Sequence, residues 1–110
     1  MITDDEVEKA VNWLRDNAEE AAQAKAERVY MEEYRKTVKA TLMSEVNDKP
    51  IGAQEAFAYA HKHYFDHLIA LREAVRVDER FRFLREAAQA KIEAWRTQSS
   101  NLRAEGKALS

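Results

Sequence analysis

The sequence contains no cysteine, only two glycines and a single proline in 110 residues. The absence of cysteine excludes disulfides, thiolate metal ligands and thiol nucleophiles. Two glycines are too few to build a glycine-rich loop that cradles phosphate. The abundant residues, among them Ala, Glu, Lys, Arg and Leu, are the strongest helix formers. The composition therefore predicts an all-α protein.

The sequence also lacks any apolar run that approaches the roughly 20 residues needed to span a bilayer. Its first residues, MITDDEVEK, are acidic where a signal peptide would be basic and then apolar. The net charge of −2, with 35% charged residues, indicates neither a polybasic protein nor an acidic one. We therefore expect a cytoplasmic protein that does not enter a membrane.

A chain of 110 residues is the size of one small domain, which can bury only part of its apolar surface. The hydrophobic fraction of 45% includes many alanines, and an alanine removes little apolar surface from water. We expect a thin core, together with some further surface that covers the apolar side chains left exposed.

Local signals define a first helix and a turn. Thr3 and Glu6 have the spacing of a capping box, and apolar residues then recur at steps of three and four. The apolar stripe changes face near Asn17, where a break is an alternative, but one long helix over about 4–46 is favoured. The segment NDKPIG at 47–52 holds the only proline and predicts a chain reversal.

The remaining sequence predicts a second long helix over about 53–105, followed by a polar tail from Gly106 onward. Its apolar residues form two successive stripes, and the change between them falls near Asp78, where the absence of a connecting segment favours a continuous helix. The predicted fold is a long antiparallel helical hairpin in a single domain, 1–110, which kinks can divide into three or four helices.

Two helices cannot hide four apolar stripes from each other, so at least one stripe must contact another chain or water. The last stripe has the near-heptad spacing of a coiled coil and includes aromatic residues, which dominate interface energetics. We therefore expect a homodimer in the form of a helical bundle. The candidate interface residues are Phe81, Leu84, Ile92, Trp95 and Leu102.

All three histidines lie within the segment HKHYFDH at 61–67. His63 and His67 have the i,i+4 spacing that places two imidazoles on one helix face, as two ligands of one metal ion require. Two ligands do not make a site, and the sequence lacks the Glu-x-x-His pairs of helical-bundle metal proteins. We interpret the segment as an exposed face and expect no metal or other cofactor, with a pH-sensitive surface as the alternative.

The second half of the chain is the more positive one, since residues 68–110 carry nine Lys and Arg against six Asp and Glu. Phosphate contacts could offset the repulsion between arginines at i,i+4, which raises the hypothesis of a DNA-associated accessory factor. The carboxylates between these arginines are more typical of an ordinary solvated helix face. The candidate nucleic-acid residues are Arg72, Arg76, Arg80, Arg82 and Arg85.

No combination of nucleophile, base and orienting group converges in this sequence, so we expect no enzyme activity. The first functional hypothesis is a non-enzymatic helical protein that binds an unidentified protein partner, and DNA binding is the rival hypothesis.

Three segments resemble a group of small proteins encoded in tailed-phage and prophage genomes, namely AERVYMEEYRKTVKATLM, IGAQEAFAYA and AAQAKIEAWRTQSSNLRA. The resemblance covers most of the chain and involves whole segments rather than a catalytic motif. It implies a partner of phage or host origin and a location in the host cytoplasm. Such proteins look like neighbours of recombination and replication genes, which implies a DNA-associated role only by association.

Overall fold

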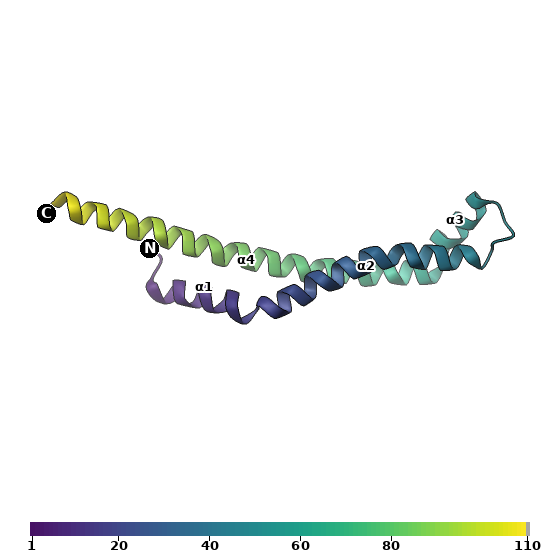
Figure 1. The fold of residues 1–110 in the computed structure, drawn as a ribbon, viewed down its shortest axis with the longest axis horizontal. Coiled ribbons are helices and arrows are strands. Elements are labelled where there is room, and N and C mark those ends of the chain that lie inside the picture. The colour runs from purple at the N-terminus through teal and green to yellow at the C-terminus, as the bar shows by residue number, and fades with distance from the viewer. Residues whose placement is uncertain (110) are drawn as a thin grey trace. The chain divides into compact units, whose positions relative to one another are not determined.

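The computed structural model describes residues 1–109, in which it contains four α-helices and no β-strand (Figure 1). This confirms the all-α fold class. Across the described part of the chain we find no helical segment with the length and apolar character of a membrane span. The helices are α1 (Asp4–Asp16), α2 (Ala18–Ser44), α3 (Ile51–Ala60) and α4 (Lys62–Leu109).

The predicted capping box starts α1. The Thr3 hydroxyl oxygen accepts a hydrogen bond from the Glu6 backbone N–H at 3.1 Å, and the Glu6 carboxylate accepts one from the Thr3 N–H at 3.2 Å. The helix ends at Asp16, so the favoured continuous helix over 4–46 is wrong. The amide of Asn17 donates to the Trp13 carbonyl at 2.9 Å, a side-chain contact that competes with the regular helical ladder.

The predicted chain reversal lies between α2 and α3. α2 ends at Ser44, and α3 begins at Ile51, immediately after Pro50 and slightly before the predicted start at 53. Pro50 is well suited to precede a helix because its φ is −57° and it has no N–H to leave unpaired. The Gln54 side chain donates to the Lys49 carbonyl at 2.7 Å, which satisfies an acceptor in the turn.

The predicted helix over 53–105 is divided at His61, whose backbone is extended with φ −73° and ψ 142°. The His61 Nδ1 accepts a hydrogen bond from the His63 backbone N–H at 3.0 Å, so this side chain caps the start of α4. The sequence carries no glycine or proline at this point, which is why the break was not foreseen.

α4 then passes through Asp78 without interruption, as predicted. The predicted end at Gly106 is wrong, because the helix continues to Leu109. No glycine has a positive φ, so Gly106 does not adopt the left-handed conformation with which a glycine commonly ends a helix.

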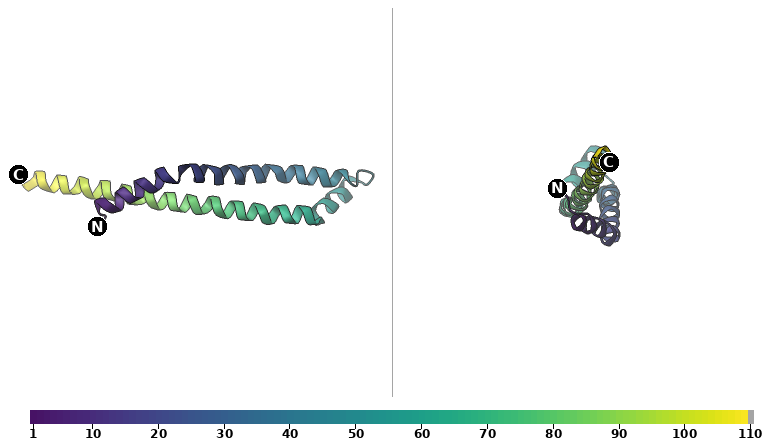
Figure 2. Two further views of the ribbon diagram at one scale, coloured as in Figure 1. Left: turned by 90° about the horizontal axis from the view of Figure 1, so that it is seen from below. Right: turned by 90° about the vertical axis from the view of Figure 1, so that its left-hand side faces the viewer.

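The chain divides into two compact units. Unit 1 comprises Met1–Ala21 and Arg80–Ser110, described to residue 109, and unit 2 comprises Ala22–Glu79. In unit 1, α1 lies beside the C-terminal part of α4 (Figure 2). In unit 2, most of α2 runs antiparallel to the N-terminal part of α4, with α3 packed at the end where the chain reverses.

The core is thin in both units. Among residues 1–108, five of the six buried residues are alanines, and none of the large side chains is fully buried. The chain exposes 8183 Å², whereas a folded monomer of this mass exposes about 6,200 Å². The buried residues are Ala10, Ala24, Leu42, Ala58, Ala74 and Ala88.

Candidate interaction surfaces

Polar contacts fix the start of the chain to α4 in unit 1. The Trp95 Nε1–H donates to an oxygen of Asp4 at 2.8 Å. Ile2 forms two hydrogen bonds with the Gln98 side chain, since its N–H donates at 3.0 Å and its carbonyl accepts at 2.8 Å. These contacts set the position along α4 at which α1 packs.

The predicted interface residues all lie in unit 1, on α4. α1 covers part of their stripe, because Phe81 packs against Trp13 with a ring separation of 6.5 Å and Trp95 contacts Asp4. Phe81, Ile92 and Trp95 are half-buried, whereas Leu84 is 40% exposed and Leu102 is 51% exposed. The break at Asn17 separates α1 from α2, and α1 supplies a covering surface that the sequence analysis had assigned to another chain.

The cover that α1 provides is incomplete and leaves an apolar groove of about 270 Å³ in unit 1. Ala10 and Trp13 of α1 line one wall of this groove, which we call the unit 1 groove. Leu84, Ala87 and Ala88 of α4 line the other wall.

Charged side chains stand at the rim of the unit 1 groove. Glu6 and Lys9 belong to α1, and Lys91 belongs to α4. Lys9 pairs with Asp5 at 3.0 Å, both side chains being exposed. No ion pair within residues 1–109 reaches Lys91. The rim therefore carries both signs of charge around an apolar floor.

The sequence analysis did not select Trp13 or Ala87 as interface residues. A usable signal was present, because Ala10 and Trp13 are three residues apart and Leu84, Ala87 and Lys91 follow at steps of three and four. Each set lies on one helix side, but only the fold brings the two sides together.

Unit 2 is cross-linked by polar side chains that are partly shielded from water. Arg28 pairs with Asp78 at 2.5 Å and with Glu32 at 2.9 Å, and the side chains of Arg28 and Asp78 are 26% and 15% exposed. The hydrogen bond with Asp78, followed by the one with Glu32, raises the pKa of Arg28 above its usual value. The contact ties α2 to α4 at the point where the sequence analysis considered a break.

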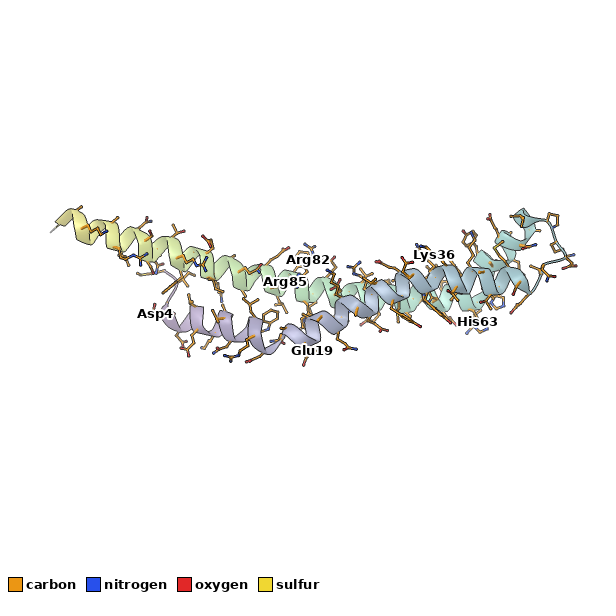
Figure 3. All side chains as sticks on the ribbon, in the orientation of Figure 1. Asp4, Glu19, Lys36, His63, Arg82 and Arg85 are labelled. Atoms are coloured by element: carbon orange, nitrogen blue, oxygen red, sulfur yellow. The ribbon has the colours of Figure 1, made fainter. Side chains whose placement is uncertain are left out.

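The two candidate metal ligands in unit 2 have different partners. A ring nitrogen of His67 lies 2.7 Å from the Met31 carbonyl oxygen, and its ring lies 5.8 Å from that of Tyr34. The exposed His63, which Figure 3 labels, instead stacks on His61 with ring centroids 4.9 Å apart. Across residues 1–109, no group of three or more His, Cys, Asp or Glu side chains could hold a metal ion.

The five candidate arginines are exposed but divide between the units. In unit 2, Arg76 contacts Glu73 at 2.6 Å, which lowers the pKa of Glu73, and Arg72 lowers it further by a smaller charge interaction. The other three, Arg80, Arg82 and Arg85, belong to unit 1.

The unit 1 arginines do not form one uniform basic face. At 100° per residue, Arg82 projects about 160° away from Arg80 on the helix. Arg82 also pairs with Glu86 at 3.0 Å and lies over the Phe83 ring. No ion pair within the described residues reaches Arg80 or Arg85, and Figure 3 labels Arg82 and Arg85. Arg80 and Arg85 of unit 1 thus remain available to an anionic partner, as does Arg72 of unit 2, which no ion pair within the described residues reaches.

The surfaces that stand out are therefore the unit 1 groove and the exposed apolar side chains of both units. No family model, curated protein or solved structure matches this chain.

Proposed function

We propose that the protein is a non-enzymatic helical interaction protein that binds other protein surfaces and does so as a homodimer. The observation that carries the proposal is the exposed area, which exceeds the value typical of a monomer of this mass by about 2,000 Å². A standard protein interface removes about 800 Å² from each partner. One dimer interface would therefore leave further exposed surface for a second partner.

The character of the exposed surface also supports protein binding. Large apolar side chains that reach water are typical of interfaces when they gather in patches, because isolated monomers rarely retain large apolar patches. The exposed apolar residues include Tyr30, Phe65 and Ile69 in unit 2 and Val11, Phe83 and Leu102 in unit 1.

Sedimentation equilibrium across the micromolar range tests this function. We expect a mass that approaches twice 12.7 kDa as the concentration rises. A mass of 12.7 kDa at every concentration would contradict the proposal, because the exposed apolar surface would then be a property of a stable monomer.

DNA binding is the second candidate function, and the unpaired Arg80 and Arg85 are the observation in its favour. Binding through so few phosphate contacts would be weak, indifferent to sequence and steeply dependent on salt. Fluorescence anisotropy with labelled single- and double-stranded DNA at two salt concentrations measures it. No binding at low salt would remove this candidate, whereas binding that Arg80→Glu with Arg85→Glu abolishes would support it.

The second protein partner is proposed to be of phage or host origin, on the strength of the three segments that resemble phage-encoded proteins. The genes that flank the coding sequence bear directly on this proposal. Neighbouring phage genes would support it, and a neighbourhood without any phage gene would count against it.

A further inference from the structure

We infer that the unit 1 groove is the surface that binds the second copy, so that two α1–α4 pairs form a four-helix bundle. The inference depends on the proposed function, because it assigns the dimer to one surface. Apart from the first turn of α2, unit 1 consists of α1 and one part of α4, and of its residues up to 108 only Ala10 and Ala88 are buried. Two helices share a single contact line, whereas four helices enclose a core.

The two sides of α4 in unit 1 differ in a way that selects the groove side. Leu84 and Ala87 line the groove, Ala94 lies on the same side of α4, and all three are exposed. Arg80 and Lys91 are exposed charged residues on this same side. The other side carries Arg85, Gln89 and Arg96 and is suited to water. A helix side on which exposed apolar residues are flanked by a few charged ones is the pattern of a helix that packs against a further neighbour with a polar rim.

Small side chains make the groove accessible to a helix. Ala10, Ala87 and Ala88 have only a methyl group each, so another helix can approach closely where they line the walls. Trp13 and Leu84 supply the larger apolar side chains that such a helix would bury. The groove thus combines close approach with apolar anchors, which is the composition of a bundle core.

A second copy is the occupant that the charges and the area fit. The rim of the groove carries Glu6 on α1 and Lys91 on α4. In a two-fold dimer the second copy brings the same two charges, so the negative charge of each copy can face the positive charge of the other. A rim of a single sign would repel its own copy. The excess exposed area of about 2,000 Å² is more than the roughly 800 Å² that a standard interface takes from each partner.

Charge substitution on the two sides of α4 tests the assignment by sedimentation equilibrium. Ala87→Glu places a carboxylate in the groove wall, four residues before Lys91. It should weaken dimerisation at least about tenfold, because this carboxylate, even when paired with Lys91, would lose its water at the contact. Gln89→Glu places the same carboxylate on the polar side as the matched control and should leave the dimer unchanged. Circular dichroism checks that both variants keep their helix content.

A cysteine reporter tests the same groove assignment without introducing a charge. The native chain has no cysteine, so Ala87→Cys and Gln89→Cys each provide one reporter of similar size. The rate of thiol modification in Ala87→Cys should fall as the protein concentration rises, and the rate in Gln89→Cys should stay constant. Equal concentration dependence at the two positions would overturn the inference.

The outcomes separate this inference from the proposed function. A native protein that is monomeric at all concentrations overturns both. A native dimer that forms equally well in Ala87→Glu and shows no protection of the thiol in Ala87→Cys overturns only the groove assignment.

Discussion

Unit 2 and unit 1 are built from similar helices but differ at one enclosed position. Ala24 and Ala74 of unit 2 are each 8% exposed, much like Ala10 at 7% and Ala88 at 8% in unit 1. Ala58 of unit 2 is 0% exposed, whereas Ala10 and Ala88 of unit 1 line a groove that reaches the surface. Unit 2 has three helices and unit 1 has two. A third helix lets small side chains be enclosed, and without it the same residue type forms the wall of an open groove.

The polar contacts of unit 1 are mixed, because the two Ile2–Gln98 hydrogen bonds are partly buried while another contact is exposed. In unit 2 the contact between Arg28 and Asp78 is partly shielded from water. In unit 1 the contact between Trp95 and Asp4 is exposed. Hydrogen bonds in exposed positions contribute less net stability because water competes for both partners. The open groove, more than these polar contacts, therefore marks unit 1 as the part that leaves apolar side chains incompletely covered.

The largest expected effect comes from disturbing the enclosed site in unit 2. Ala58→Leu adds volume where none is available and should lower the free energy of unfolding by about 1–3 kcal/mol. Ala56→Leu adds the same side chain at an exposed position of α3 and should have little effect. Urea denaturation of both variants measures the difference, and equal stabilities would show that Ala58 is not enclosed.

A smaller effect is expected in unit 1 from the helix cap. Thr3→Ala removes the acceptor that holds the Glu6 N–H and should lower the free energy of unfolding by about 1 kcal/mol. Thr3→Ser keeps the hydroxyl and should retain most of that stability. Because α1 forms one wall of the groove, Thr3→Ala should also weaken dimerisation in sedimentation experiments. If Thr3→Ala lowers the free energy of unfolding but leaves dimerisation unchanged, α1 does not contribute to the interface.

The smallest effect concerns the exposed pair of Glu73 and Arg76 in unit 2. The pKa of Glu73 is lowered, chiefly by its hydrogen bond with Arg76, so its carboxylate stabilises the fold at pH values above the ordinary 4.5. This contribution disappears as the pH falls through the lowered value. Glu73→Gln should therefore lower Tm slightly at neutral pH and leave it unchanged in strong acid. Thermal scans at both pH values test this, and high salt should reduce the neutral-pH difference.

The sequence was sufficient to predict those features of the fold that depend on neighbouring residues. The Thr3 and Glu6 spacing predicted the start of α1, and the lack of any breaker near Asp78 predicted continuity there. The composition predicted the all-α class. Each of these features depends on residues within one or two helical turns, which the sequence presents directly.

The features that the sequence did not predict are of two kinds. Some depend on side chains that bind backbone groups, and others depend on contacts between helices that are far apart in the sequence. His61 caps α4 although histidine is not a favoured capping residue, and Asn17 ends α1 without help from glycine or proline. The contact of Trp13 with Phe81 joins residues far apart in the sequence. Helical periodicity identified the apolar stripe on α4, but it contained no information that α1 would cover part of it.

Hydrogen exchange at increasing protein concentration tests the central claim that a second copy covers unit 1. We predict that backbone amides around Trp13 and Ala88 become more protected as the concentration rises, because dimerisation buries the groove that they line. Amides around Ala58 in unit 2 should exchange at the same rate throughout. Protection in unit 1 that is independent of concentration, or that rises only in unit 2, would contradict the account.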